Sequence, residues 1–199
     1  MVTRGFKGRR SGDASRVPPG QSVVEGFPVL SIGPAPKLDL TAWRFFLKDG
    51  PRLIKIWDWE SFCALEQTEK TVDIHCVTTW SKLDTVWRGV TIDTICADAD
   101  IEPPTAYALA HAADDYSTNV PVADLLGGKA MIATHFGGSP LMREHGGPAR
   151  LLVPHLYFWK SAKWVTGLQF TKRNEAGFWE LRGYHMRGDP FQSQRYGGL

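Results

Sequence analysis

Apolar and polar residues alternate along several short runs of the chain, which is the pattern of half-buried β-strands. Turn residues separate these runs, as Asp49-Gly50-Pro51 does between two of them. The pattern predicts strands at residues 43–47, 53–56, 70–78, 107–111, 131–135 and 163–171, and a short apolar strand within 145–154. Short helices are predicted at 58–65, with Asp58 as N-cap, at 91–97 and at 122–126. Strands and helices do not alternate regularly, so the expected fold class is α+β with mixed sheets rather than a doubly wound fold.

The start of the chain differs in composition from the rest. Residues 1–26 are polar, basic and rich in Gly, Ser and Pro, which predicts an extended or mobile N-terminal arm. Three prolines within Phe27–Pro36 predict an extended segment rather than a helix. A length of 199 residues favours a single domain, here 27–199.

Charge and cysteine content exclude several classes of protein. A net charge of +2 is too small to indicate nucleic-acid binding, and no apolar run is long enough to predict a membrane span. The three cysteines, Cys63, Cys76 and Cys96, have no CxxC spacing, which disfavours a disulfide framework or a zinc site and favours a reducing, cytoplasmic location. Arg9-Arg10 lacks the apolar run that would follow in a twin-arginine signal. Eight tryptophans suit either an aromatic core or an aromatic wall around a flat ligand.

Cys76 is the first candidate for chemistry. Val72, Ile74 and Cys76 share one face of the predicted strand 70–78, and a loop rich in Thr, Ser and Trp follows the cysteine. The neighbouring His75 and Lys82 favour a thiolate, and thiolates are ligands that transition metals accept readily. Two alternatives stay open: an inert buried thiol, and a nucleophile paired with a histidine base. His75 would point to the opposite face of the strand, so that base would have to be another histidine.

The second candidate is a cluster between residues 145 and 163. Gly146 and Gly147 permit close backbone approach, Arg150 offers a fork suited to phosphate, and the run 157–163 adds two amines and a hydroxyl. The cluster predicts a site for a phosphate-bearing cofactor, with a solvated basic turn as the alternative.

Four segments together resemble the sulfite-oxidase family of molybdopterin oxidoreductases. HCVTTWSKLDTVWRGV resembles the molybdenum-ligand segment, and HGGPARLLVPHLYFWKSAKWV resembles the segment that binds the pterin phosphate. FPVLSIGPAP is similar to the family's N-terminal cofactor segment, and GFWELRGYHMRGDP to its active-site tyrosine segment, with Trp179 five residues before Tyr184. The order of the segments is that of the family, and the length is that of its short single-domain bacterial members. Residues 27–199 are then the molybdopterin-binding oxidoreductase domain.

The resemblance implies roles for individual residues. Cys76 would be the protein ligand to molybdenum in a molybdenum–molybdopterin cofactor, and Tyr184 would donate a hydrogen bond to a substrate or oxo oxygen as the second catalytic residue. The residues implied in cofactor binding are Ser31, His111, His145, Arg150, Ser161, Ala162 and Lys163. The spacing around His111 is loose, and a structural histidine is the alternative there.

The implied activity is oxygen-atom transfer to or from a small sulfur or nitrogen oxo compound, such as sulfite or a sulfoxide. In our alignment Leu30 occupies the position where sulfite oxidases have an arginine that clamps sulfite, which favours a neutral S- or N-oxide. The chain reaches Leu199 without a haem or dimerisation domain, so electrons are expected to pass through a separate carrier: a cytochrome, ferredoxin or flavoprotein. The alternatives are a non-catalytic molybdopterin carrier and a hydrolase that uses Cys76 as nucleophile.

Overall fold

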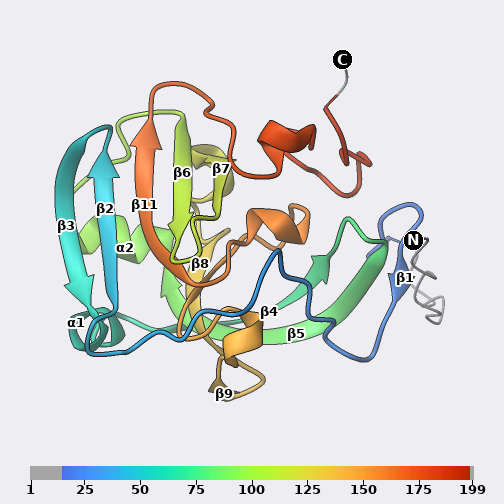
Figure 1. The fold of residues 1–199 in the computed structure, drawn as a ribbon, viewed down its shortest axis with the longest axis horizontal. Coiled ribbons are helices and arrows are strands. Elements are labelled where there is room, and N and C mark those ends of the chain that lie inside the picture. The colour runs from blue at the N-terminus through green and yellow to red at the C-terminus, as the bar shows by residue number, and fades with distance from the viewer. Residues whose placement is uncertain (1–14, 198–199) are drawn as a thin grey trace.

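The computed structural model describes residues 15–197. It contains two mixed β-sheets joined by short helices (Figure 1), as the α+β prediction requires. The larger sheet has the strand order β1-β5-β8-β10, with β4 paired to β5 and β9 paired to β8. Its strands are β1 (Ser22–Val23), β4 (Thr68–His75), β5 (Trp80–Thr91), β8 (Met131–Phe136), β9 (Ser139–Pro140) and β10 (Arg150–Leu152).

The second sheet has the order β3-β2-β11-β6-β7 and stands at the left of Figure 1. Its central strand β11 pairs parallel with β2 and antiparallel with β6. The strands are β2 (Arg44–Asp49), β3 (Arg52–Asp58), β6 (Tyr107–Ala112), β7 (Ser117–Pro121) and β11 (Val165–Thr171). The main hydrophobic core draws on both sheets, because Phe45, Ala108 and Leu168 of this sheet share it with Val90 and Ile132 of the other.

The helices are few and short. Asp58 caps α1 (Trp59–Cys63) as predicted, since its side chain accepts a hydrogen bond from the Ser61 amide. Within residues 15–197 the other α-helix is α2 (Ile92–Asp98), and there are four short 3-10 helices: η1 (Val122–Asp124), η2 (Arg143–His145), η3 (Phe158–Lys160) and η4 (Glu180–Arg182). In residues 15–197 no helix has the length and hydrophobicity that a membrane crossing requires.

The alternation of residues located most strands within a few positions, but four were missed: β5, β7 and the two-residue strands β1 and β9. The twelve-residue β5 lies at the centre of its sheet, and β7 lies at the edge of the other. The strand predicted at 70–78 ends at His75, so Cys76 lies in the turn that follows β4 rather than in the strand.

The described part of the N-terminal segment combines turns and bends with the short strand β1. Residues 1–14 of the predicted arm, including Arg9-Arg10, lie outside the described residues. Ser22 and Val23 form β1, which pairs parallel with the start of β5, and Arg16 makes a salt bridge to Asp73. The division of the chain at residue 26 stays a prediction.

Two ion pairs involve residues of the 3-10 helices η1, η3 and η4. Lys160 and Glu180 form a salt bridge of 2.6 Å, and both side chains are inaccessible to solvent. Asp124 accepts hydrogen bonds from His155 at 3.1 Å and from Arg187 at 3.1 and 3.2 Å. Both pairs connect the last part of the chain to earlier segments.

Candidate functional site

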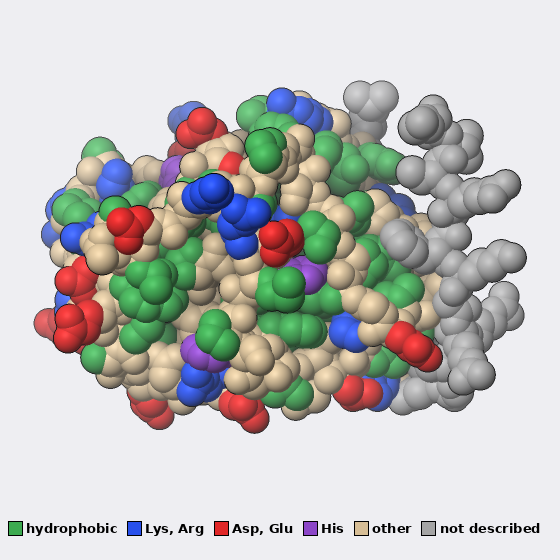
Figure 2. Space-filling model, turned by 60° about the horizontal axis from the view of Figure 1, so that its bottom comes forward, with side chains coloured by type: hydrophobic (Ala, Val, Ile, Leu, Met, Phe, Trp, Pro, Cys, Tyr) green, Lys and Arg blue, Asp and Glu red, His purple; other side chains and the backbone are tan. Residues whose placement is uncertain are grey.

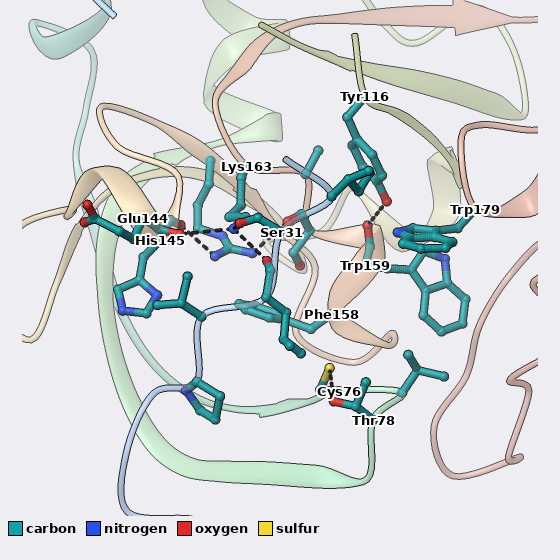
Figure 3. A pocket seen from close by; sticks show the side chains of 18 of the residues that line it. Ser31, Cys76, Thr78, Tyr116, Glu144, His145, Phe158, Trp159, Lys163 and Trp179 are labelled. Atoms are coloured by element: carbon teal, nitrogen blue, oxygen red, sulfur yellow. Dashed lines mark hydrogen bonds between the residues drawn. The ribbon is translucent and has the colours of Figure 1, made fainter. Parts of the chain in front are cut away.

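A cavity of about 310 Å³ brings together most of the residues that the sequence nominated (Figure 3). Its lining includes eight of the nine predicted site residues: Ser31, Cys76, His145, Arg150, Ser161, Ala162, Lys163 and Tyr184. His111 is the exception. It lies on β6, where its Nε2 is 3.0 Å from Gln169 Oε1 on β11, and it does not line the cavity. The structure therefore supports the structural alternative for His111.

Cys76 lies at one end of the cavity, in the tight turn between β4 and β5. The Cys76 amide donates to Trp80 O at 2.8 Å, and the Thr79 amide donates to Cys76 O at 3.0 Å. Thr79 has a φ of 74°, the left-handed conformation that closes such a turn. The side chain of Cys76 is 7% exposed, and the Thr78 hydroxyl donates to its Sγ at 3.1 Å. The turn thus presents a buried thiol with one hydroxyl donor.

The expected thiolate partners of Cys76 make other contacts. His75 Nδ1 is 2.8 Å from Ser81 Oγ, and Lys82 Nζ donates to Glu25 O at 2.5 Å. Burial raises the pKa of the Cys76 thiol, and the Thr78 hydrogen bond only partly opposes this rise. The free thiol is therefore the favoured form unless a metal ion replaces its proton, as coordination of thiols does.

Arg150 also lines the cavity and is 2% exposed. Its Nη1 donates to His145 O at 2.8 Å and its Nη2 to Ser161 O at 2.7 Å, while the guanidinium lies 4.0 Å from the centre of the Phe158 ring. Burial lowers the pKa of Arg150 to about 9. In the part of the chain that the structure describes, no carboxylate pairs with this buried cation.

Lys163 is a second cation of the same kind. Its Nζ donates to Leu30 O at 2.8 Å, to Ser31 Oγ at 2.5 Å and to Glu144 O at 3.0 Å, as the dashed lines of Figure 3 show in part. Burial, and to a smaller degree the charge of Arg150, lowers the pKa of Lys163 to about 8. Two neighbouring cations whose hydrogen-bond partners here are neutral oxygens form a strong binding site for an anion.

The two glycines of the predicted phosphate turn serve protein packing. A Cβ on Gly146 would lie 2.9 Å from Lys163 Cβ, and a Cβ on Gly147 would lie 2.1 Å from Leu141 O. Gly146 also has a φ of 108°, which strains any other residue. The glycines therefore permit the turn to pack against Lys163 and Leu141, which places His145 and Arg150 at the cavity.

His145 is stacked against the N-terminal segment. Its ring lies 3.9 Å from that of Phe27, with an angle of 11° between the planes. Burial lowers the pKa of His145, and the charges of Arg150 and Lys163 lower it further, so the ring is neutral at pH 7. A neutral ring can donate one hydrogen bond to a ligand without adding charge.

Aromatic side chains form the wall on which Tyr184 lies. The Tyr184 ring is 5.0 Å from Trp159 and 5.0 Å from Trp179, and the Tyr116 hydroxyl donates to Trp159 O at 2.6 Å. Sequence reasoning missed Thr78, Asp114, Tyr116 and Trp159 as lining residues. The number of tryptophans was the one available signal for this wall, and the structure shows that they serve both the core and the cavity.

The comparison with protein families decides the class of this site. A family model described as the oxidoreductase molybdopterin-binding domain matches residues 32–179. The chain belongs to this family. It is thus a molybdopterin-dependent oxidoreductase, and the resemblance to the sulfite-oxidase family is confirmed.

Three related proteins and one solved structure show the range of the family. The chain is 46% identical over 194 residues to "Uncharacterized oxidoreductase YuiH" of Bacillus subtilis (strain 168), covering 96% of each. It is 27% identical to "Putative protein-methionine-sulfoxide reductase subunit YedZ1" of Azospira oryzae (66% of this chain, 50% of the relative). It is 25% identical to the mitochondrial sulfite oxidase of Drosophila melanogaster (49% and 19%). The sulfane dehydrogenase SoxCD from Paracoccus pantotrophus has the same fold, with a TM-score of 0.61 at 20% identity, covering 70% of this chain and 40% of that one.

The cavity of this member fits the family's cofactor on its own chemistry. Molybdopterin carries a phosphate, which matches the unpaired cations Arg150 and Lys163. Its metal accepts a thiolate, and Cys76 is a buried thiol in the same cavity. The indole Nε1 of Trp80, which also lines the cavity, is a buried donor without a partner among the described residues.

Proposed function

We propose that this protein transfers an oxygen atom to or from a small sulfur or nitrogen oxo compound, with Cys76 as the protein ligand to molybdenum. One observation carries the proposal: a single cavity is lined by a buried thiol, by the buried cation of Arg150 and by the half-buried cation of Lys163, and neither cation has an anionic partner within residues 15–197. A long anionic cofactor that ends in a thiophilic metal would satisfy both the thiol and the two cations. When bound, the cofactor supplies the two-electron redox chemistry, and the chain's own residues supply binding and orientation.

The residues divide into two groups in this proposal. Arg150 and Lys163 bind the phosphate, and the hydroxyl and backbone of Ser161, the backbone of Ala162, the hydroxyl of Ser31 and the neutral ring of His145 line the pterin. Tyr184 lines the same cavity as Cys76, and burial raises the pKa of its phenol. A phenol that keeps its proton is a hydrogen-bond donor for a substrate oxygen.

The substrate that the cavity favours is a neutral S- or N-oxide undergoing reduction. Leu30 lies at the cavity with its side chain about half exposed, and Val29 and Ile32 continue this apolar rim. Trp159 and Trp179 also line the cavity, in contact with the Tyr184 ring. The name of the Azospira relative, which mentions methionine sulfoxide, supports the same class. A separate electron carrier and a cytoplasmic location stay predictions; the three cysteines are free in the structure, which is consistent with a reducing compartment.

The hydrolase alternative has weaker support. Among the described residues Thr78 is the side chain that hydrogen-bonds to Cys76 Sγ, and His75 and His145 make the contacts given above. A nucleophilic cysteine needs a base within hydrogen-bond reach. The carrier alternative differs from an enzyme in turnover, which an experiment can measure.

The test compares metal content and turnover in three proteins from a molybdopterin-producing host: wild type, Cys76→Ala and the control Cys96→Ala. Cys96 is also a free buried cysteine, on α2 in the core. We expect near-stoichiometric molybdenum and a thiolate-to-metal absorption band in wild type and Cys96→Ala, and loss of the band in Cys76→Ala. Wild type without molybdenum would refute the proposal.

Turnover then fixes the direction of the reaction. Reduction of a dialkyl sulfoxide with a reduced viologen dye is expected to be faster than oxidation of sulfite with ferricyanide. The opposite ranking would identify a sulfite oxidase, and stoichiometric metal without either reaction would support the carrier.

A further inference from the structure

The chain after η4 forms a hairpin that carries Tyr184. This C-terminal hairpin, residues 183–197, closes through an antiparallel bridge between Tyr184 and Tyr196. The His185 amide donates to Arg195 O at 3.2 Å, and the Gly197 amide donates to Gly183 O at 2.9 Å. The hairpin lies beyond residues 32–179, the part that matches the family model.

Arg195 reaches from this hairpin to the turn that contains Cys76. Its Nη1 donates to the carbonyl oxygen of Val77, the residue directly after Cys76. Its guanidinium lies 5.5 Å from the centre of the Tyr157 ring. No carboxylate of the described chain forms a salt bridge with Arg195, so its positive charge is not neutralised locally.

The N-terminal segment makes a second set of hydrogen bonds to this turn. Gln21 Nε2 donates to Cys76 O at 3.0 Å, and the Ser22 amide donates to Thr79 O at 2.9 Å. Figure 1 shows the blue N-terminal and the red C-terminal segments on the same side of the molecule, near the start of β5. The N-terminal segment contributes neutral groups, whereas the C-terminal hairpin contributes a cation.

We propose that Arg195 is a positioning residue that fixes the Cys76 turn against the Tyr184 hairpin and would favour reduction of a metal held by Cys76. Each electron added to a metal bound by Cys76 adds negative charge, which a nearby guanidinium stabilises. Arg195 is half-buried, so solvent ions screen this interaction less than at a free surface. The inference rests on the proposed ligation by Cys76.

The chain offers a matched control in Arg182. Its Nη1 donates to Phe178 O at 2.8 Å and its guanidinium lies 3.5 Å from the centre of the Phe178 ring. Arg182 therefore makes the same two kinds of contact as Arg195, on an exposed 3-10 turn, and does not line the cavity.

The first measurement uses metal-free protein and does not depend on the cofactor. Hydrogen exchange of the backbone amides of residues 76–79 is compared in wild type, Arg195→Gln and Arg182→Gln. Loss of a hydrogen bond from a charged donor is expected to speed exchange about tenfold in Arg195→Gln. Arg182→Gln should leave these amides unchanged. Unchanged exchange in Arg195→Gln would overturn the positioning role.

The second measurement is the midpoint potential of the molybdenum-loaded proteins, from redox titration followed by electron paramagnetic resonance. Arg195→Gln is expected to change the equilibrium constant of one-electron reduction about tenfold, a fall of about 59 mV in potential. Arg195→Lys keeps the charge and should keep the potential, while its exchange at 76–79 rises because the planar fork is lost. If Arg195→Gln does not fold, Arg195→Lys is the test of the positioning role. Hydrogen exchange at residues 76–79 that is as slow in Arg195→Lys as in wild type then overturns the proposal.

The outcomes separate this inference from the proposed function. Wild type without molybdenum refutes the ligation by Cys76, whatever the exchange data show. Molybdenum-loaded wild type with an equal potential in Arg195→Gln, or with an equal fall in Arg182→Gln, overturns only the role of Arg195.

Discussion

Replacing Lys160 by methionine tests how much one buried ion pair contributes to this fold. Lys160 Nζ lies 2.6 Å from Glu180 Oε1, 2.7 Å from Asn119 Oδ1 and 2.7 Å from Met186 O, and both members of the pair are inaccessible to solvent. Burial lowers the pKa of Lys160 to about 8, so the ammonium is the main form at pH 7. In Lys160→Met the carboxylate of Glu180 stays buried, with neutral donors only.

The magnitude follows from that uncompensated charge. Breaking a buried pair on one side costs about 3–5 kcal/mol in the free energy of unfolding. For a protein of this size each kcal/mol lowers the melting temperature by about 2–4 °C, so a fall of roughly 6–20 °C is expected. The double variant Lys160→Met/Glu180→Gln removes both charges and keeps an acceptor for Trp159 Nε1, which is 2.8 Å from Glu180 Oε1. The free energy of unfolding should therefore fall less in this double variant than in the single variant Lys160→Met.

The assay is urea unfolding at pH 7, followed by tryptophan fluorescence, on wild type, both single variants and the double variant. Equal slopes against denaturant show that stability alone has changed. A loss below about 1 kcal/mol in Lys160→Met would refute the assigned cost of the unpaired carboxylate. So would a double variant whose loss equals the sum of the two single losses, because contacting residues should not behave additively.

Three further predictions concern pH, anions and packing. Although burial alone raises the pKa of Asp124, its hydrogen bonds to two basic partners lower it to about 2. The stabilisation from the ionised Asp124 carboxylate is complete above about pH 4 and is lost as the pH falls through about 2. Asp124→Asn should therefore lower the free energy of unfolding in urea by about 1 kcal/mol at pH 7 and by almost nothing at pH 2. An equal loss at both pH values would contradict this assignment. Inorganic phosphate should raise the melting temperature of the metal-free protein, and Lys163→Met should need about tenfold more phosphate for the same rise. An unaltered dependence of the melting temperature on phosphate concentration would exclude Lys163 from the anion site. Gly147→Ala should destabilise the protein by about 1–3 kcal/mol, because the new Cβ would lie 2.1 Å from a backbone oxygen. Gly33→Ala should be nearly neutral, because nothing lies within 4 Å of its new Cβ. Equal melting temperatures of the two variants would contradict that contrast.

Strand prediction succeeded where alternation was regular and failed where it was broken. In β5 the neighbours Trp80 and Ser81 are both buried, as are Val90 and Thr91, and Asp84 has a φ of 53°. These irregularities remove the two-residue period that marks a half-buried strand. In β7 the buried residues are partly polar, since Thr118 bonds Glu180 and Asn119 bonds Lys160, and a local pattern cannot reveal partners that are distant in sequence.

The candidate site was predictable to the extent that its residues occur in ordered motifs. Cys76, Arg150 and Lys163 belong to such motifs, and the cavity contains them all. Thr78 and Arg195 act through single contacts to an atom of the Cys76 turn, without a characteristic spacing. The same difficulty explains His111, which has a plausible position in the sequence but lies on β6 away from the cavity.

The hydrogen bonds that hold the Cys76 turn from both ends of the chain have a consequence for the order in which the protein folds during synthesis. Gln21 and Arg195 contact consecutive carbonyl groups of this turn, yet they are separated by most of the chain. Contacts of such high sequence separation form late, because the intervening loop must first be closed. A nascent chain that has not yet exposed Arg195 holds the turn from one side only. Complete ordering of the Cys76 turn would therefore wait until the chain up to Arg195 has been synthesised and has folded, so that loading of a cofactor held by this turn would report that the segment from Gln21 to Arg195 is in place.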